Sequence, residues 1–329
     1  MKIYDCFIFN DELMLLNLRL HELYDSVDYF VIVESTKTFT QKKKPLHFND
    51  NKEQFLRFQD KIIHIVVDDV PREEDDWAKA YFQRNFISRK FLNCDEPQVG
   101  EAWRQEYFQR NAICRGLTNC QGDDIIILSD LDEIPDKTKF NQINPKKYNI
   151  FLMRLFYFFF NCEMVLSDAW LKKLTKRKSI CTYNAWRGTT ATSFRLLKSA
   201  QHLRLMKPRL YPWWRFDRIH PHCIRDGGWH FSNLMDVKGL QSKISSYAHT
   251  EQNTPEITNE KALKARIRSA VLGTEEGSSN AVKRYASRVV EIDSSFPQYL
   301  LSHRNLFREY ILDDKKIEEF KLEQAPKNN

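Results

Sequence analysis

The chain has 329 residues, of which 42% are hydrophobic and 29% are charged, so it can build a sizeable core and is neither disordered nor collagen-like. The net charge is +7, but the basic excess is local: residues 172–225 hold 14 Lys or Arg and one acid, whereas the remainder has 37 bases against 43 acids. A local excess predicts one anionic partner at one site.

The N-terminal residues predict a β-α-β unit. Residues 3–9 have the apolar character of a short strand, and residues 29–33 predict a second strand, rich in β-branched side chains, that ends at Glu34. Asn10 or Asp11 is placed to cap the intervening helix, whose apolar face is formed by Leu13, Leu16, Leu20 and Leu23. Two strands joined by a helix are expected to pair in parallel, with a right-handed crossover.

Further strands of the same sheet are predicted at residues 62–67 and 124–128, which are almost wholly apolar. Later in the chain, residues 260–272 and 282–290 have a polar, helix-like pattern. The charged residues from Asp313 onward predict a solvated end.

The change of pattern near residue 150 predicts two halves. We expect a nucleotide-binding half at 1–150 and an acceptor-binding half at 151–329, which includes the basic segment 172–225 and the helical C-terminus. No stretch rich in Pro, Gly or Ser separates them. The halves are therefore expected to pack tightly, and they can form one continuous domain.

One aromatic sequence pattern occurs twice in the chain, in segments 26 residues apart. The pattern Trp-x3-Tyr-Phe-Gln-Arg-Asn begins at Trp77 and again at Trp103. One interpretation is a pair of amphipathic helices that pack similar aromatic faces. The other is that one copy supplies its Arg or Asn to a ligand site.

The strongest motif is an apolar strand that ends in clustered acids, Ser129-Asp130-Leu131-Asp132-Glu133. Carboxylates this close repel one another, and a hard divalent cation with oxygen ligands explains the arrangement best. Mn²⁺ or Mg²⁺ held by one or two of these carboxylates would keep positions open for a diphosphate. Two alternatives stay open: helix capping involving Asp136, and a haloacid-dehalogenase-like phosphatase with Asp130 as nucleophile.

Three blocks in matching order carry a resemblance to a known family. They are Val27–Ser35 with the Thr38–Thr40 and Pro45–Phe48 segments, then Ser129–Pro135, then Gly228–Ser232. Together they resemble glycosyltransferase family 17 over about residues 3–255. The resemblance implies an α/β fold of the glycosyltransferase A type, Rossmann-like with a mostly parallel central sheet between helices, and a C-terminal acceptor part.

The same resemblance implies a metal-dependent inverting transferase that moves a sugar, GlcNAc from UDP-GlcNAc in the known activity, to a glycan or other hydroxyl acceptor. The Asp-x-Asp motif of such enzymes maps onto Asp130 and Asp132, with Asp130 also assigned to donor binding. Glu34 occupies the place where A-type transferases contact the nucleoside, and Arg154 matches a further family position. A late His is a metal or diphosphate ligand in many A-type transferases, which assigns His230 to the metal site.

An inverting transfer also needs a carboxylate that deprotonates the acceptor hydroxyl. We favour Asp226, because Gly227-Gly228 after it permits close backbone approach and Trp229 offers a face on which a sugar can stack. Glu251 is the second candidate. A plain turn at Asp226 is the alternative interpretation.

The remaining predictions concern partners and location. Residues 211–216 interleave aromatics with Arg, which suits single-stranded nucleic acid or a sugar beside a diphosphate, and the Asp-x-Asp motif favours the sugar. Seven Cys without a CxxC pair, no glycosylation sequon and no signal-like N-terminus predict a cytoplasmic protein. No apolar run approaches the length of a membrane span, although peripheral membrane contact toward a lipid-linked acceptor stays open. A non-catalytic sugar-binding or nucleic-acid-binding protein is the remaining alternative.

Overall fold

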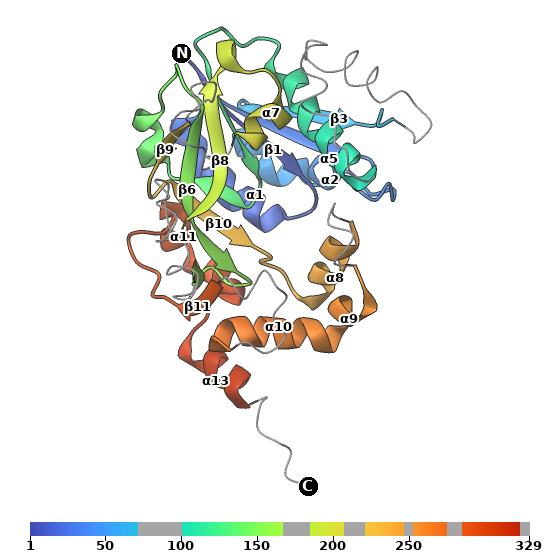
Figure 1. The fold of residues 1–329 in the computed structure, drawn as a ribbon, viewed down its shortest axis with the longest axis vertical. Coiled ribbons are helices and arrows are strands. Elements are labelled where there is room, and N and C mark those ends of the chain that lie inside the picture. Colours follow the sequence, from blue (N-terminus) through green and yellow to red (C-terminus); the bar gives the residue numbers. More distant parts are fainter. Residues whose placement is uncertain (72–100, 167–184, 207–220, 247–252, 275–284, 323–329) are drawn as a thin grey trace, which may run out of the picture.

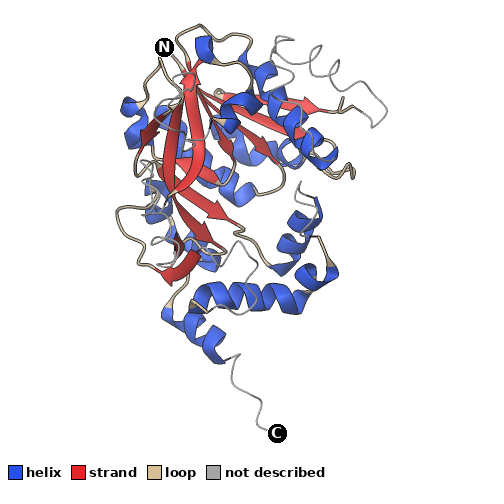
Figure 2. Cartoon of the chain, in the orientation of Figure 1, coloured by secondary structure: helices blue, strands red, loops and turns tan. Residues whose placement is uncertain are grey.

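The computed structural model describes residues 1–71, 101–166, 185–206, 221–246, 253–274 and 285–322. In this part of the chain the strands form one mixed sheet, with helices packed on it (Figures 1 and 2). The strands are β1 (Ile3–Phe9), β2 (Tyr29–Ser35), β3 (Ile62–Val67), β4 (Ile125–Asp130), β5 (Glu133–Pro135), β6 (Asn149–Tyr157), β7 (Cys162–Leu166), β8 (Trp186–Ser193), β9 (His222–Ile224), β10 (Gly228–Ser232) and β11 (Tyr285–Val289).

The helices come from both halves of the chain. The α-helices are α1 (Leu13–Leu23), α2 (His47–Asn51), α5 (Glu101–Asn111), α7 (Ala200–Leu205), α8 (Val237–Ser246), α9 (Pro255–Thr258), α10 (Glu260–Leu272), α11 (Gln298–Ser302), α12 (Arg304–Phe307) and α13 (Asp314–Leu322). Short 3₁₀ turns cover Tyr24–Ser26, Lys52–Phe58, Ala112–Leu117, Lys137–Gln142, Phe194–Leu196 and Arg308–Tyr310. No helix among the described residues has the length and apolar character needed to cross a bilayer.

The strand order along the main sheet is β11-β7-β6-β8-β4-β1-β2-β3. The pairs β3-β2, β2-β1 and β1-β4 are parallel, and β8 lies antiparallel between β4 and β6. β9 and β10 run parallel to β6, and β5 pairs antiparallel with β10. Most strands therefore share one direction, which confirms a mixed α/β fold with a largely parallel sheet.

Alternation along the buried strands separates two core layers. Phe7 and Phe9 of β1 pack with the leucines of α1 and with C-terminal residues, whereas Tyr4 and Cys6 face α5, residues 112–117 and α7. The central strands β1, β2 and β4 are buried along most of their length on both faces, as expected for the centre of a parallel sheet between helices. The described cysteines carry no disulfide, and four of them are buried.

The β-α-β unit is confirmed, and so are the strands predicted at 62–67 and 124–128, which are β3 and β4 in the structure. The predicted cap is wrong, since Glu12 precedes the first turn of α1 and no side-chain cap hydrogen bond forms. The prediction of a helix at 282–290 is also wrong, because residues 285–289 form β11, paired with β7. Here sheet pairing outweighs a local pattern that is compatible with a helix.

Two other expectations concern the second half of the chain. The charged end is not simply solvated, because α13 places Ile317 and Phe320 against a small core cluster around Cys162. β8, from after residue 150, lies between β4 and β6. One sheet therefore continues across the boundary expected near residue 150.

Candidate functional site

The acidic motif lies at the carboxyl end of β4, where this strand neighbours β1. Asp130 is the last residue of β4 and pairs in register with Ile8 of β1. The chain adds β2 and β3 on one side of β1 and β4 on the other, so strand order reverses between β1 and β4. Open α/β sheets bind ligands outside the carboxyl ends of strands at such a reversal.

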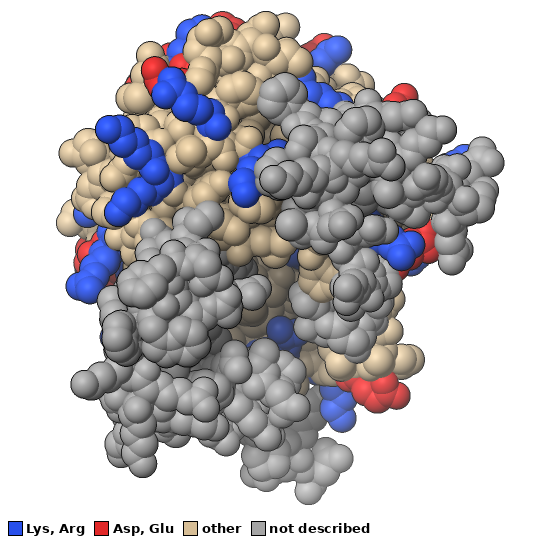
Figure 3. Space-filling view, turned by 45° about the horizontal axis from the view of Figure 1, so that its top comes forward, with Lys and Arg blue, Asp and Glu red and all other residues tan. Residues whose placement is uncertain are grey.

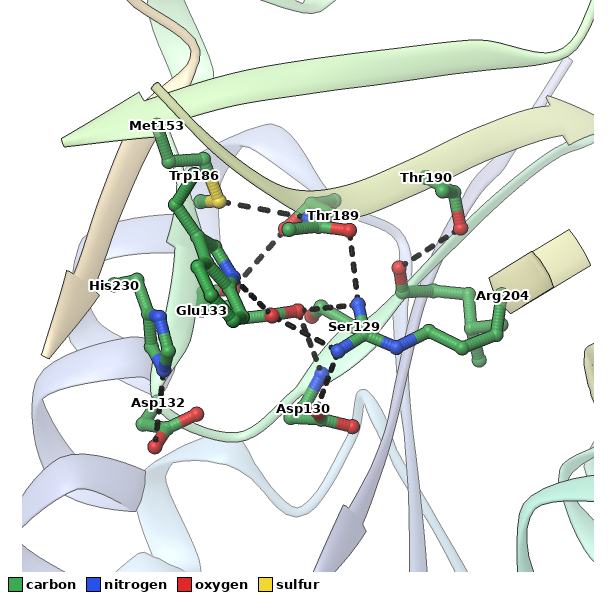
Figure 4. A network of polar contacts seen from close by, with 12 residues as sticks. Ser129, Asp130, Asp132, Glu133, Met153, Trp186, Thr189, Thr190, Arg204 and His230 are labelled. Atoms are coloured by element: carbon green, nitrogen blue, oxygen red, sulfur yellow. Dashed lines mark hydrogen bonds and ion pairs between the residues drawn. The ribbon is translucent and has the colours of Figure 1, made fainter. Parts of the chain in front are cut away.

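Two arginines hold Asp130, and Figure 4 shows one of them, Arg204, beside it. Arg204 of α7 contacts one carboxylate oxygen at 2.5 Å, and Arg110 of α5 contacts the other at 3.2 Å. Burial alone would raise the pKa of Asp130, but the two guanidinium groups outweigh it and lower that pKa. The Asp130 side chain is still 41% exposed, so this anion faces a potential ligand.

Glu133 is a buried carboxylate of the same network. Arg204 contacts its two carboxylate oxygens at 2.7 and 2.9 Å, and Trp186 donates its indole N–H to it at 2.7 Å. The backbone N–H of Asp130 also bonds to Glu133, at 3.2 Å. Glu133 therefore holds the turn and Arg204, and Arg204 in turn holds Asp130.

Asp132 faces a second group of cationic and aromatic side chains. His230 of β10 places Nε2 3.5 Å from Asp132 Oδ2, and Lys243 of α8 places Nζ 3.6 Å from the same oxygen. Burial would raise the pKa of Asp132, but His230 and Lys243 together lower it. Trp186 packs against the His230 ring with 4.6 Å between ring centroids, and His230 Nδ1 is buried without a hydrogen-bond partner among the described residues.

A fully buried arginine donates hydrogen bonds to the backbone of the acidic turn. Arg19 of α1 forms an ion pair with Asp5 of β1 through two contacts, at 2.6 and 2.8 Å, and both side chains are 0% exposed. Its Nη1 lies 2.9 to 3.1 Å from the carbonyl oxygens of Asp130, Leu131 and Glu133. The backbone of the acidic turn is therefore fixed by a side chain from the first helix.

In the space-filling view of Figure 3, the face of the molecule is hollowed, and Lys or Arg atoms are visible inside the hollow. In the part of the chain that the structure describes, no group of three or more His, Cys, Asp or Glu side chains is arranged to hold a metal. Asp132 and His230 are the predicted ligands that the structure brings together, with Asp130 beside them.

Glu34 lies at the end of β2, as predicted, but its carboxylate is already hydrogen-bonded. It accepts the backbone N–H groups of Phe48 at 2.9 Å and Asn49 at 3.4 Å, and lies 3.2 Å from His64 Nε2. The carboxylate thus binds the first turn of α2, and it is completely buried. Its predicted contact with a nucleoside stays a prediction.

Arg154 and Trp229 lie together, away from the acidic turn. Arg154 pairs with Glu163 of β7 at 2.7 Å and donates to Ser295 Oγ at 2.8 Å. Trp229 is buried in the core and donates its indole N–H to the Ser295 carbonyl oxygen at 2.9 Å. Adjacent residues of a strand point to opposite faces, so Trp229 faces away from the side on which His230 meets Asp132.

The two candidate bases are placed differently. Asp226 is exposed on a turn, in left-handed backbone conformation (φ 49°), at the opposite end of β10 from Ser232. Gly227 and Gly228 allow close packing against other parts of this chain, not against a sugar. A Cβ at Gly227 would meet Phe151, and a Cβ at Gly228 would meet the Ile134 carbonyl oxygen. The structure therefore does not bring Asp226 to the acidic turn. Glu251 lies outside the described residues.

Sequence reasoning missed Arg204, Arg19 and Lys243, and it offered Arg110 only through one of two interpretations of the repeated aromatic pattern. Arg204 belongs to the basic segment 172–225, and Arg110 is the arginine of the second aromatic copy. Arg19 sits among the leucines of α1, and a charged residue in such a position indicates a buried partner. Lys243 had no signal, because only the fold brings α8 to the turn. The first aromatic copy, from Trp77, lies outside the described residues, as do residues 211–216.

The fold and the site define an α/β protein with an acidic, ligand-facing turn at the reversal point of a parallel sheet. A model of glycosyltransferase family 17 matches residues 1–276. Curated β-1,4-mannosyl-glycoprotein 4-β-N-acetylglucosaminyltransferases from Homo sapiens and Rattus norvegicus are 28% identical to this chain over 130 residues, and the one from Mus musculus is 27% identical. No solved structure matches the chain significantly.

The chain belongs to glycosyltransferase family 17, since the family match covers most of its length. This confirms the predicted family and enzyme class. The similarity to the named relatives covers 38% of this chain and 20% of each relative, so the matched part spans about a fifth of their length.

Proposed function

We propose that this protein is a metal-dependent inverting glycosyltransferase of the A-type fold, which moves GlcNAc from UDP-GlcNAc to a hydroxyl of a glycan or lipid-linked acceptor. The observation that carries the proposal is the Asp130–Glu133 turn at the reversal point of the sheet, with cations from α5, α7 and α8 converging on it. Family membership supports the reaction class, and the names of the relatives support the donor sugar.

The residues at the turn fit a divalent ion. Asp132 and His230 offer one carboxylate and one imidazole, which face each other and form a donor set suited to Mn²⁺. A metal with one or two protein ligands leaves positions for a diphosphate. When bound, the ion would neutralise charge on the departing diphosphate.

The other side chains prepare the site for the donor. Arg204 and Arg110 keep Asp130 ionised, and each oxygen of a carboxylate retains lone pairs that can accept a hydroxyl of the nucleotide sugar. Glu133 fixes the direction of Arg204, and Arg19 fixes the backbone of the turn. These groups are positioned by the fold before the donor binds, which is the condition for strong electrostatic stabilisation of developing charge.

The acceptor hydroxyl must lose its proton to a carboxylate, and we propose Glu251 ahead of Asp226. α8 reaches the turn through Lys243 and ends at Ser246, and Glu251 follows five residues later in the sequence. Five residues span at most about 18 Å. Asp226 lies at the far end of β10. Glu251→Gln should abolish transfer while UDP affinity stays near normal, and an inactive Asp226→Asn beside an active Glu251→Gln would reverse the assignment.

Two alternatives from the sequence are less well supported. A phosphatase would need Asp130 as a nucleophile, but both of its oxygens are paired with guanidinium groups, which stabilise the carboxylate and reduce its nucleophilicity. A non-catalytic binding protein would not require the family's Asp-x-Asp turn. Neither alternative is favoured by a contact in the site.

A screen of nucleoside diphosphate sugars tests the proposal. The expected result is hydrolysis or transfer with UDP-GlcNAc that needs Mn²⁺ or Mg²⁺, together with metal-dependent UDP binding in calorimetry. With Asp132→Ala, turnover should vanish and donor binding should become metal-independent in a folded protein. Asp123→Ala, which removes an exposed carboxylate 78% open to solvent, is the matched control and should behave as wild type.

Two outcomes would refute the assignment at different levels. No response to any sugar nucleotide would refute glycosyl transfer from such a donor. Metal-stimulated turnover that persists in Asp132→Ala would refute the metal position at the turn while leaving the reaction class intact.

A further inference from the structure

Lys243 is a cation shared between two carboxylates at the edge of the site. Its Nζ lies 3.4 Å from Glu12 Oε1 and 3.6 Å from Asp132 Oδ2. Glu12 immediately precedes α1, and Asp132 belongs to the turn after β4. The Lys243 side chain is 25% exposed, so it is largely but not completely shielded from solvent.

The position of Lys243 is set by the packing of α8. Leu240 and Ile244 on the buried face of this helix pack with Phe158 and Leu263. The first turn is capped by the Asp236 carboxylate, which accepts the Gly239 backbone N–H at 2.7 Å. These contacts fix the backbone from which the flexible four-carbon stem of Lys243 extends.

A further contact ties the end of α8 to the first half of the chain. The Thr40 hydroxyl donates to the Ser245 carbonyl oxygen at 3.2 Å. Lys243 therefore projects from a helix that is held by contacts with both the first and the second half of the chain. From this helix its side chain reaches both Glu12 and Asp132.

Lys243 and a divalent ion would compete for the same oxygen. Asp132 Oδ2 is the atom that both His230 and Lys243 approach. An ion bound there would repel the ammonium group, because two cations close to one carboxylate oxygen interact unfavourably even in water. Glu12 gives the displaced ammonium a second carboxylate within reach, so it need not leave the site.

We propose that Lys243 acts as the resident cation of Asp132 and, when a divalent ion takes that oxygen, becomes a direct ligand of the donor diphosphate. This rests on the proposed function. Three mobile N–H donors on an ammonium group suit phosphate oxygens, and a charge-assisted bond to phosphate is about twice as strong as a neutral one. Lys243 thereby weakens metal binding in the empty protein and strengthens nucleotide binding in the metal-loaded protein.

The test measures two affinities in the full chain with Lys243→Met. The first is the affinity for MnCl₂ alone, followed by the electron paramagnetic resonance signal of free Mn²⁺. The second is the affinity for UDP at saturating Mn²⁺, measured by calorimetry. Lys238→Met, which removes an exposed lysine from the same helix, is the matched control. Circular dichroism melting checks that each variant is folded.

The expected changes have opposite signs. Mn²⁺ alone should bind about tenfold more tightly to Lys243→Met, the order expected when one unit charge is removed beside a divalent ion. UDP should bind at least about tenfold more weakly, since one charge-assisted contact is lost. Lys243→Arg should resemble wild type in both measurements, and Lys238→Met should change neither.

Other outcomes overturn the inference. If both affinities fall together in folded Lys243→Met, or if neither changes, Lys243 neither competes with the metal nor binds the diphosphate. Lys243→Gln keeps a polar end and serves as the second variant if Met disturbs α8. A wild-type chain that binds neither Mn²⁺ nor UDP would refute the proposed function and the inference with it, whereas normal wild-type binding with unchanged variants would refute the inference alone.

Discussion

The acidic turn depends on Arg19, so we expect Arg19→Met to damage both stability and donor binding. Met has a similar length and is apolar, but it leaves the Asp5 carboxylate completely buried without its partner. It also removes donors from Ser129 Oγ and from the carbonyl oxygens of Asp130, Leu131 and Glu133. Breaking a buried ion pair by removing one partner costs about 3–5 kcal/mol.

The size of the effect is measured by urea unfolding, with tryptophan fluorescence and circular dichroism as probes. Asp5→Asn/Arg19→Met should be less destabilised than the sum of the two single variants, because the unpaired charge is gone in the double variant. In the conditions where Arg19→Met stays folded, its UDP affinity in Mn²⁺ should still fall, since the turn loses its backbone support. Arg195→Met, which removes a guanidinium group 70% exposed from a surface ion pair, should cost no more than about 1 kcal/mol.

A loss of stability below about 1 kcal/mol for Arg19→Met would refute this reasoning. It would mean that water or a neighbouring side chain reaches Asp5 after the substitution. A large loss of stability with unchanged UDP affinity in the folded fraction would instead separate Arg19 from the geometry of the site and restrict it to the core.

Three further predictions follow from single contacts. Arg204→Lys should reduce stability by about 2 kcal/mol and weaken UDP binding, because an ammonium group cannot bridge two carboxylates as a guanidinium does; urea unfolding and calorimetry measure the two effects. Gly228→Ala should cost at least about 2 kcal/mol in urea unfolding, because φ is 137° and a Cβ would lie 2.2 Å from the Ile134 carbonyl oxygen, while Gly122→Ala is the mild control. Burial, with a smaller effect of a nearby lysine, lowers the pKa of His202 to about 4, so the unfolded chain binds its proton first and stability falls as pH drops from about 6.5 toward 4. His202→Phe should remove roughly 1 kcal/mol of that loss when unfolding at pH 7 and pH 5 is compared, and an unchanged pH dependence would contradict it.

Much of the fold could be predicted because the central strands carry their own signal. Residues 30–33 and 125–128 are uninterrupted apolar runs rich in β-branched side chains, as is typical of strands buried on both faces. β11 could not be predicted in this way. Its residues have no apolar pattern of their own, and its strand conformation depends on pairing with β7, including the Arg288 contact to Glu163 at 2.7 Å.

The part of the candidate site that lies in one short segment, the acidic motif, could be predicted from the sequence. Asp130 and Asp132 directly follow an apolar run with a strong strand pattern, so their position at the carboxyl end of a central strand could be predicted from the sequence. Lys243 lies more than 100 residues later, on a helix whose contact with the turn depends on the packing of the second half of the chain. Trp229 shows the opposite error, since an aromatic beside a predicted ligand suggested a sugar platform but is part of the core.

The charges of the site give an independent reason to expect a divalent ion. Among the described residues, the ion pairs of Asp130 and Asp132 join five carboxylates to three cations. The carboxylates are Asp130, Asp132, Glu12, Glu106 and Glu133, and the cations are Arg110, Arg204 and Lys243. These carboxylates and these Lys and Arg side chains together carry a net charge of −2, which would repel a diphosphate. One divalent ion brings the group to neutrality, so metal should bind before the donor, and UDP affinity without metal should rise when Glu12 or Asp132 is neutralised. UDP binding to wild type that is equally tight with and without Mn²⁺ would show that the described cations suffice, and that the charge argument is wrong.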